Sequence, residues 1–548
     1  MLHRADSPPS KVESGFEPYV QVSRPLLECI HSYTENPIRR TTLVSAMIEY
    51  GGAAPMLHAP NGMSRRRIFG RPLDAHSDPI DATMKRGRYA ARRRMTAAVV
   101  LMLFAAQGVR AQSAPAQLLS GPMVGHTSSS AATVWVETDR PAAVDVDYWV
   151  EAGALPIVRG VASERTDDEP PHTGVVRLEG LPNGGIVHYE LKIEGRAVRP
   201  ETAQTFTLLP AAGSDAADFT VAFASCMNPS RVPIQPIWTQ VGVFRPDALL
   251  LIGDNNYMPM RPGAYETDEG TVSYAMARYH RYLRDLPGLR SVLATTPTYA
   301  IWDDHDFGPN NSDRTFRWRE LSLHAFKKYW PNPAAGTADT PGVFYSFQVG
   351  DAEFFMLDDR YHRDPNDAPD RNTMLGADQL AWLKDGLSES TATFKVIVNG
   401  HTMTIDRQDQ GEYWANFGNE RTEFLEWMYA ENIEGVLFAS GDWHVGSLSR
   451  IAFTDDGYPL YELISSNAGV ASVEDDVHHY RYNRQTSGHN RRFDGPIIND
   501  IRDYNFGLFE FSGGAGSRTV TLKLVDHHGE VRVSHQLTEK DLSSQWRD

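Results

Sequence analysis

The feature that most constrains this chain is a set of six short apolar runs, each passing directly into acidic, amide, imidazole or thiol side chains. Short apolar runs that alternate with helical stretches are typical of the strands of an α/β sheet. The polar ends of the six runs are Ser225-Cys226, Gly253-Asp254-Asn255-Asn256-Tyr257, Asp303-Asp304-His305-Asp306, Asp358-Asp359-Arg360, Asn399-Gly400-His401 and Ser440-Gly441-Asp442-Trp443-His444.

One such ending is commonly explained by helix capping, because an Asp side chain accepts hydrogen bonds from the free N–H groups of a helix start. Six endings in one region are too many for capping alone. Functional groups gather at the carboxyl ends of strands in α/β sheets, and a residue just after a strand stands on a rigid support. So many carboxylates at one edge would repel each other without cations. The pattern therefore predicts a metal centre.

The residue types at the strand ends indicate which ions fit. Asp, Asn and His suit hard or borderline ions, whereas the thiolate of Cys226 and the phenolate of Tyr257 suit ferric iron better than calcium. The alternative for Cys226 is a buried, inert cysteine. A glycine directly precedes an Asp or His at three of the ends, where it permits a tight turn and a close backbone approach to a ligand. These glycines are Gly253, Gly400 and Gly441.

Two regions of different periodicity lie along the chain. Residues 117–210 alternate apolar and polar side chains between Gly/Pro/Asn turns, which predicts an all-β sandwich of the fibronectin or immunoglobulin type. Residues 218–540 alternate apolar runs with amphipathic stretches, which predicts an α/β layered domain. Its expected helices span 274–286, 320–329, 377–387 and 420–431. The polar stretch 472–503 is expected to be a long loop.

The N-terminal region differs from the rest. A basic cluster at Arg92-Arg93-Arg94 precedes a short apolar run and a small-residue site ending at Ala111, so residues 92–111 are typical of a signal peptide. The run is too short for a stable membrane span. We expect residues 1–94 to be a misassigned start or disordered, with translation beginning at Met84 or Met95. The arginines leave both Tat and Sec export open. The mature protein is expected to be periplasmic or extracellular.

The net charge of the chain limits the kinds of molecule that it is expected to bind. The formal net charge of −17 argues against a specific nucleic-acid partner, because binding a phosphate backbone requires a basic face. A small phosphorylated substrate stays compatible with this charge, because a metal cluster can outweigh the global field locally.

The strand-end motifs together resemble the PhoD-like family of alkaline phosphatases, within the calcineurin-like metallophosphoesterase superfamily. The resemblance covers residues 117–540 and the export signal. It implies a four-layer metallophosphoesterase β-sandwich flanked by helices and preceded by the all-β domain. It also implies hydrolysis of phosphomonoesters, phosphodiesters or both, with Fe3+ and Ca2+ as cofactors. The motifs that carry it are Phe223-Ala224-Ser225-Cys226, Gly253-Asp254-Asn255-Asn256-Tyr257, Trp302-Asp303-Asp304-His305-Asp306, Leu357-Asp358-Asp359-Arg360 and Ser440-Gly441-Asp442-Trp443-His444.

The resemblance implies two sets of metal ligands that share Asp254. The ferric set is Cys226, Asp254, Tyr257 and Asp442. The calcium side has Asp254, Asp304 and His444, with Asn310 or Asn311 completing the shell. Arg360 is expected to hold the substrate phosphate as a planar fork.

Two histidines are candidate catalytic groups. His305 and His401 are each expected to donate a proton to the leaving oxygen or to support the metal ligands. For His401 a plain turn after Gly400 stays open as an alternative. The chain departs from the usual family pattern at three positions, where the resemblance is less informative about the surroundings of the metals. These positions are Asn255, Asp306 and Trp443.

Two alternatives to a simple phosphatase stay open. One is a non-catalytic, calcium-stabilised cell-surface binding protein, against which Cys226 and Tyr257 speak because calcium requires neither. The other is cleavage of nucleotide or phospholipid-type diesters on the same scaffold, since one phosphate site serves small esters of each kind.

Overall fold

The computed structural model describes residues 114–547, apart from 200–203, 215–216, 259–264, 367–371, 404–412, 455–456 and 471–495. The predicted signal peptide at 92–111 and the predicted misassigned start lie outside the described residues. In the described part of the chain, no helix is long and apolar enough to cross a membrane.

The region from 118 to 207 contains two antiparallel sheets with an apolar layer between them. Along β3, Val144 and Val146 point into this layer and are buried, while Asp145 and Asp147 alternate with them. Assignment of this module to the fibronectin or immunoglobulin type stays a prediction. One sheet has β1 (Leu118–Thr127), β2 (Ala132–Thr138) and β5 (His172–Leu178). The other has β3 (Ala143–Glu151), β4 (Val158–Arg165), β6 (Ile186–Ile193), β7 (Arg196–Ala197) and β8 (Thr205–Thr207).

The following region contains two larger mixed sheets. The first has the order β11-β10-β9-β19-β20-β21, in which β9, β10 and β11 are parallel. All five residues of β10 are buried, which explains why it reads as an unbroken apolar run. The bounds are β9 (Phe219–Ala224), β10 (Ala248–Ile252), β11 (Thr298–Ile301), β19 (Asn505–Ser512), β20 (Thr519–Asp526) and β21 (Val531–Thr538).

The second large sheet has the order β12-β13-β14-β15-β17-β16-β18, in which β13, β14, β15 and β17 are parallel. The two sheets share one apolar core, where the ring of Phe511 lies 5.4 Å from that of Phe394. The bounds are β12 (Tyr345–Val349), β13 (Ala352–Met356), β14 (Phe394–Asn399), β15 (Val436–Ser440), β16 (Gly446–Ile451), β17 (Leu460–Ser465) and β18 (Pro496–Ile501).

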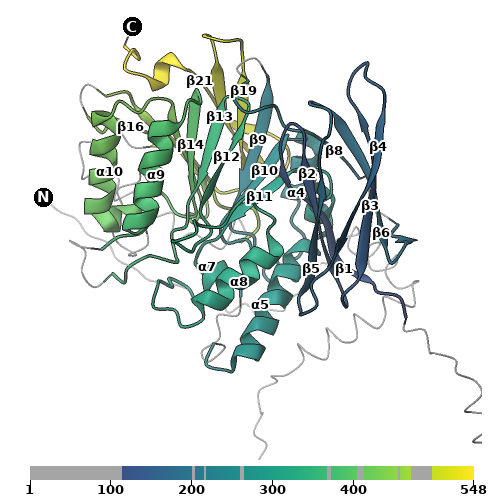
Figure 1. The fold of residues 1–548 in the computed structure, drawn as a ribbon. Coiled ribbons are helices and arrows are strands. Elements are labelled where there is room, and N and C mark those ends of the chain that lie inside the picture. The colour runs from purple at the N-terminus through teal and green to yellow at the C-terminus, as the bar shows by residue number, and fades with distance from the viewer. Residues whose placement is uncertain are drawn as a thin grey trace, which may run out of the picture. The chain divides into compact units, whose positions relative to one another are not determined.

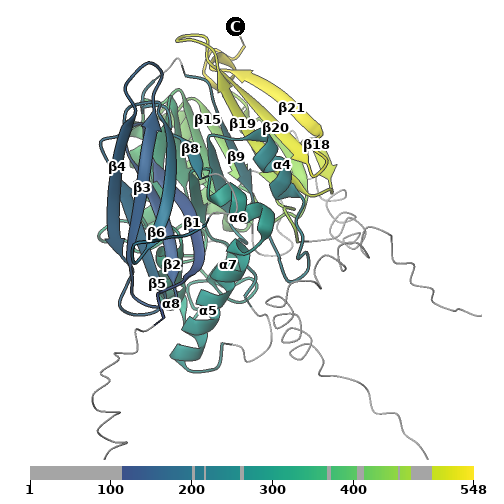
Figure 2. The same ribbon diagram turned by 90° about the vertical axis from the view of Figure 1, so that its right-hand side faces the viewer.

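Helices lie beside both large sheets. Figure 1 shows α9 and α10 along the strands of the second sheet, and Figure 2 shows α4 beside β19, with α6 next to α4. Trp382 of α9 packs against Phe355 of β13, with 6.2 Å between ring centroids. The bounds are α4 (Ile237–Phe244), α5 (Glu269–Arg284), α6 (Pro287–Leu293), α7 (Asp304–Phe307), α8 (Arg319–Tyr329), α9 (Ala377–Glu389) and α10 (Gly418–Ala430), with short 3-10 turns η1 (Trp414–Phe417) and η2 (Lys540–Leu542).

The four predicted helices are confirmed as α5, α8, α9 and α10. Helix α5 begins five residues earlier than expected, because the Asp268 side chain caps it by accepting the Thr271 N–H. The short helices α4, α6 and α7 were not predicted, since each has too few turns for a periodic pattern. The expected loop at 472–503 is wrong for Pro496–Ile501, which pair with β16 as β18. Residues 471–495 lie outside the described part.

Candidate active site

The ends of parallel strands from both large sheets meet at the candidate site. At the ends of β9 and β10, the Met227 N–H donates to the Asp254 carbonyl at 2.9 Å. At the ends of β14 and β15, the Gly441 N–H donates to the Gly400 carbonyl at 3.1 Å. Parallel register therefore places the thiol, carboxylate and imidazole groups of separate motifs at one edge, as the sequence predicts.

Asp254 lies between two groups of possible metal ligands. Its Oδ2 accepts the Tyr257 hydroxyl at 2.7 Å and lies 3.7 Å from the Cys226 sulfur. Its Oδ1 accepts the backbone N–H of His305 at 3.3 Å. The two oxygens of one carboxylate thus face opposite sides, which is the arrangement a bridging ligand requires.

Three clusters of side chains bring their ligand atoms within 4.8 Å of one another. We call them the thiol cluster (Cys226, Asp254, His444), the carboxylate cluster (Asp254, Asp304, His305) and the arginine-linked cluster (Asp303, Asp359, His401). The first two share Asp254. Residues of the third are all buried.

The distribution of ligands differs in one respect from that implied by the family resemblance, because His444, expected on the calcium side, lies in the thiol cluster. His305, expected to donate a proton or to support the metal ligands, lies in the carboxylate cluster, where its ring stacks on Tyr257 with centroids 4.2 Å apart. Asp304 lies in this cluster as expected, and its Oδ2 accepts the Asn311 N–H at 2.6 Å.

Asp442 faces His401 across the site. Its Oδ2 lies 3.4 Å from the Nδ1 of His401. Burial opposes ionisation, yet the His401 imidazole lowers the pKa of Asp442 below its usual value. Asp442 is also close enough to Cys226 to act on its thiol electrostatically.

The backbone at the candidate ligands is strained. Cys226, Asp254, Asp442 and His444 all have positive φ angles, between 51° and 63°, although none is glycine. This left-handed conformation costs a side-chain-bearing residue roughly 1–2 kcal/mol. These four are half of the eight such residues in the described part of the chain. Strain of this kind persists at functional sites, where surrounding structure imposes it.

The ionisable groups of the site show an excess of negative charge. Burial and the neighbouring Asp304 raise the pKa of Asp254 well above its usual value. Burial and Asp254 likewise raise the pKa values of the Cys226 thiol and the Tyr257 phenol. Each of these groups would ionise readily beside a cation, which supplies the missing charge. Thiol, phenol, carboxylate and imidazole donors therefore fit iron on the Cys226 side and a hard cation on the Asp304 side.

Arg360 does not stand in an open pocket. Its side chain is 0% exposed, its Nε donates to Asp303 Oδ1 at 2.7 Å, and its Nη1 donates to the Ser312 carbonyl at 3.1 Å. Its Nη2 also contacts the Nε2 of His401. Asp303 thus already binds the Arg360 guanidinium, which the sequence analysis assigns to a substrate phosphate. The phosphate-binding role would require Arg360 to leave this carboxylate.

Asn310, the expected calcium ligand, lies in an exposed turn. Its side-chain amide contacts the side chain of the adjacent Asn311, whose backbone N–H binds Asp304. Of the two asparagines, Asn311 is therefore the one in direct contact with a candidate ligand, through its main chain rather than its amide.

Sequence reasoning missed Asp303 and Asp359, although both lie in the quoted motifs. Each is one of a pair of adjacent aspartates whose members have different contacts. Asp358 accepts the indole N–H of Trp302 at 2.7 Å, whereas Asp359 Oδ2 accepts the His401 N–H at 3.1 Å. The sequence shows only how far each aspartate lies from the end of its strand, and this does not tell which of two adjacent aspartates points into the site.

Two of the residues that depart from the family pattern contact each other. Asp306 Oδ2 accepts the backbone N–H of Asn255 at 3.0 Å, and its side chain completes the capping box of α7. Asp306 Oδ1 accepts the Asn256 N–H, also at 3.0 Å. The carboxylate of Asp306 therefore fixes the turn after Asp254 from outside the clusters.

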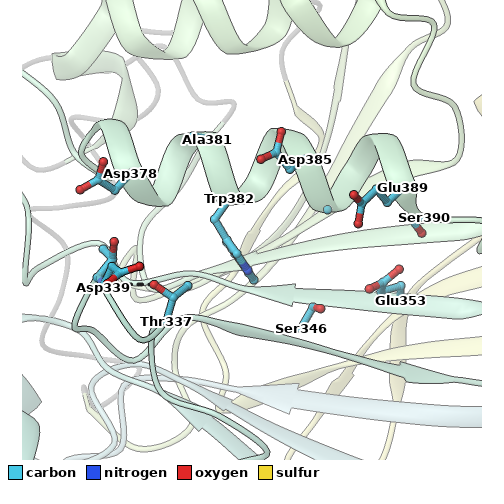
Figure 3. Close-up of a pocket in the computed structure, with 12 residues that line it drawn as sticks. Thr337, Asp339, Ser346, Glu353, Asp378, Ala381, Trp382, Asp385, Glu389 and Ser390 are labelled. Atoms are coloured by element: carbon cyan, nitrogen blue, oxygen red, sulfur yellow. Dashed lines mark hydrogen bonds between the residues drawn. The ribbon is translucent and has the colours of Figure 1, made fainter.

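A groove of about 640 Å³ between α9 and the β12–β13 hairpin is a separate feature (Figure 3). Trp382 projects from α9 toward the strands in this view. No cluster residue lines the groove. Its acidic residues are Asp339, Glu353, Asp378, Asp385 and Glu389. All but Glu353 are exposed, so solvent screens their charges.

The two-sheet fold and the sequence agree with comparisons to known proteins. A family model described as PhoD-like phosphatase matches residues 221–500, which are 280 of the 548 residues. Residues 115–210 match a model for a domain of unknown function, DUF7800. The alkaline phosphatase D of Bacillus subtilis (strain 168) is 24% identical over 323 residues, covering 51% of this chain and 54% of the relative. The match thus spans about half of that relative's length.

Solved structures support the fold. A structure of PhoD has a TM-score of 0.59 at 18% identity, covering 76% of this chain and 88% of the other. The purple acid phosphatase PPD1 from yellow lupin (Lupinus luteus) seeds has a TM-score of 0.54 at 12% identity, covering 76% and 74%. The fold is therefore of the α/β class found in these two phosphatase structures. The chain belongs to the PhoD-like phosphatase family, as its strand-end motifs predict.

Proposed function

We propose that this protein is a metal-dependent phosphoesterase that uses Fe3+ and Ca2+ to hydrolyse small phosphate esters. Family membership supports the phosphoesterase class. The observation that carries the metal assignment is the two-sided placement of Asp254, with Oδ2 toward Cys226 and Tyr257 and Oδ1 toward His305.

The proposed ligands divide between the two sides of Asp254. Thiolate and phenolate donors suit the ferric ion, and the carboxylate cluster suits calcium. When bound, such metals acidify a water molecule and stabilise charge on the transferring phosphoryl group. The ferric ligands are proposed to be Cys226, Asp254, Tyr257 and Asp442, joined by His444. The second site is proposed to be formed by Asp254 and Asp304, with His305 beside them.

The side chains of this chain supply orientation and proton transfer. His305 is 8% exposed, and its Nδ1 makes no hydrogen bond to the described residues. It is the better placed of the two histidines to protonate a leaving oxygen. His401 is 0% exposed and lies between carboxylates, which favours a supporting role. Arg360 provides the fixed positive charge nearest to these groups.

The substrates we propose are small phosphomonoesters or phosphodiesters, including nucleotide and phospholipid-type esters. A buried, metal-centred site suits a compact phosphate group, and the net charge of −17 disfavours a nucleic-acid polymer. The signal-like residues 92–111 support export to the periplasm or cell exterior.

The test is the metal content of the purified protein by mass spectrometry, with a visible spectrum and assays on p-nitrophenyl phosphate and its bis-ester. We expect iron and calcium, a tyrosinate–iron absorption band and ester hydrolysis, and the preferred ester would separate monoesterase from diesterase activity. A colourless, calcium-only protein that hydrolyses neither ester would instead establish the cell-surface binding alternative.

A further inference from the structure

Asp303 occupies a space between the two large sheets that two glycines keep open. It follows β11 and begins α7, and it is 1% exposed. A Cβ on Gly253, at the end of β10, would lie 2.8 Å from the Asp303 Cβ. A Cβ on Gly400, at the end of β14, would lie 3.1 Å from the same atom. Both glycines thus allow close approach of this carboxylate.

Asp303 contacts two buried cationic or titratable side chains at once. Its Oδ1 accepts the Nε–H of Arg360 at 2.7 Å and lies 3.2 Å from the Nε2 of His401. Arg360 is held on its other side by the Ser312 carbonyl. The buried Arg360 guanidinium and Asp303 carboxylate therefore both contact the Nε2 edge of the His401 imidazole.

The opposite edge of the same imidazole faces Asp442. His401 Nδ1 lies 3.4 Å from Asp442 Oδ2, and the His401 N–H donates to Asp359 Oδ2 at 3.1 Å. With contacts at both ring nitrogens and at the main chain, the ring plane has little freedom. A continuous path runs from Asp303 through His401 to Asp442.

The geometry points to Asp303 as a positioning residue that fixes the proposed iron ligand Asp442 through His401. Carboxylates that orient histidines beside metal ligands act in this way, and their loss typically lowers metal affinity or activity about 10- to 100-fold. Asp303 is not itself expected to bind iron, because Arg360 occupies its Oδ1 and the thiol cluster excludes it. This inference rests on the proposed function for the identity of the metal.

The test compares Asp303→Asn with His401→Gln, the double variant and Asp351→Asn. Asp351 is a matched control, since it is a buried carboxylate paired with Arg518 at 2.7 Å outside the three clusters. We measure iron affinity by competition with a chelator, the tyrosinate–iron band and ester hydrolysis. Asp303→Asn and His401→Gln should each weaken iron binding about 10- to 100-fold and shift the band. Asp351→Asn should do neither.

The double variant shows whether Asp303 acts through His401. Loss of iron affinity in the double variant should be no greater than in the single variant with the larger loss, because Asp303 acts on the iron ligand only through His401. The inference would be overturned if the losses in the double variant were additive, or if either single variant bound iron as tightly as the wild type. If Asp303→Asn does not fold, the iron affinity of His401→Gln decides alone. A wild-type protein that binds iron but cleaves neither ester would refute the phosphoesterase proposal and leave this result standing. A wild type without iron would refute both.

Discussion

Two buried groups of charged side chains differ in how their charges balance. Where β2 meets α5 and α8, Glu137 is 1% exposed and accepts hydrogen bonds from the Arg281 guanidinium and, at 3.1 Å, from the Tyr329 hydroxyl. One turn further along α5, the buried Arg284 lies over the Trp330 ring at 4.1 Å and donates to the His280 carbonyl. In this group, which we call the Glu137 network, the one carboxylate is paired with Arg281, and the Arg284 guanidinium is held by main-chain carbonyls and aromatic rings.

The candidate active site instead has more buried negative charge than its cationic side chains can pair. Its carboxylates outnumber its cationic side chains, and Asp303 Oδ2 and Asp359 Oδ1 are buried oxygens without a hydrogen-bond partner in the described part of the chain. Unpaired buried charge is costly, so it persists only where something else compensates it. The difference teaches that the carboxylate of the Glu137 network is compensated by a cationic side chain of the chain itself, whereas the carboxylates of the candidate site exceed their cationic partners, and this excess is the reason for proposing cations there.

The largest expected effect comes from removing the shared ligand of the unbalanced group. Asp254→Asn keeps the shape of the side chain but removes the charge that both metal sides require. We expect loss of both metals and a fall in kcat/KM of at least about 1000-fold, or roughly 4 kcal/mol of transition-state stabilisation. Metal analysis and ester assays measure this, and wild-type turnover would exclude Asp254 as the bridging ligand.

A substitution in the Glu137 network should instead lower the stability of the fold and leave metal binding unchanged. Glu137→Ala leaves Arg281 without its partner at the junction of β2 and α5, so we expect the free energy of unfolding to fall by about 3–5 kcal/mol. Denaturant titration measures the change. Metal content and kcat of the folded variant should match the wild type. Replacing Glu137 and Arg281 together with Leu and Met should recover much of the loss. A drop in iron content would show that the two networks are coupled.

In the metal-free protein, the unbalanced group should make stability depend on pH. Burial opposes the charged imidazole, but Asp303 and Asp442 together raise the pKa of His401 to about 9. A raised pKa means that its stabilisation is fully present below about pH 6.5 and is lost as the pH rises through about 9. The loss corresponds to about 3 kcal/mol.

The Tm of the chelated protein at pH 6 and pH 9.5 tests this dependence. We expect a lower Tm at pH 9.5 and a smaller difference between the two pH values in His401→Gln. With metals bound, the Tm should change less, because cations favour the deprotonated ligands. An equal pH response in chelated wild type and His401→Gln would assign the effect to other groups.

The smallest effect is expected where acidic residues are numerous but exposed. Asp385 lines the groove beside α9 (Figure 3), and solvent screens its charge. Asp385→Asn should leave metal content, kcat and Tm at wild-type values within error, since surface substitutions seldom exceed about 0.5 kcal/mol. Loss of calcium in this variant would show that the groove, too, holds a cation.

Much of the phosphatase region was predictable because its signals are local. The run Ala248–Ile252 is apolar because β10 is buried on both faces, and Asp254 follows at the functional edge because parallel strands end there together. Helices α8 and α9 have periods long enough to be recognised, whereas α7 has four residues and was not. The family assignment followed from the order of the motifs.

The contacts of individual side chains were less predictable. His444 was expected with calcium and lies in the thiol cluster, and Asn310 was expected as a ligand and lies in an exposed turn. Arg360 was expected to hold the substrate phosphate, and its guanidinium donates to Asp303. Beyond a strand end the side-chain period of two no longer holds, so spacing does not say which way a residue points.

By itself, then, the sequence determined the strands, the edge at which their polar ends gather and the family to which the chain belongs, since each depends on the order of residues along one segment. Only the tertiary structure decided that Asp254 faces two ligand groups and that Asp303 holds Arg360 and His401. It also separated Asp358 from Asp359. These relations join β10, β11, β13 and β14 of two different sheets, and their geometry is set by how the sheets pack rather than by any single segment.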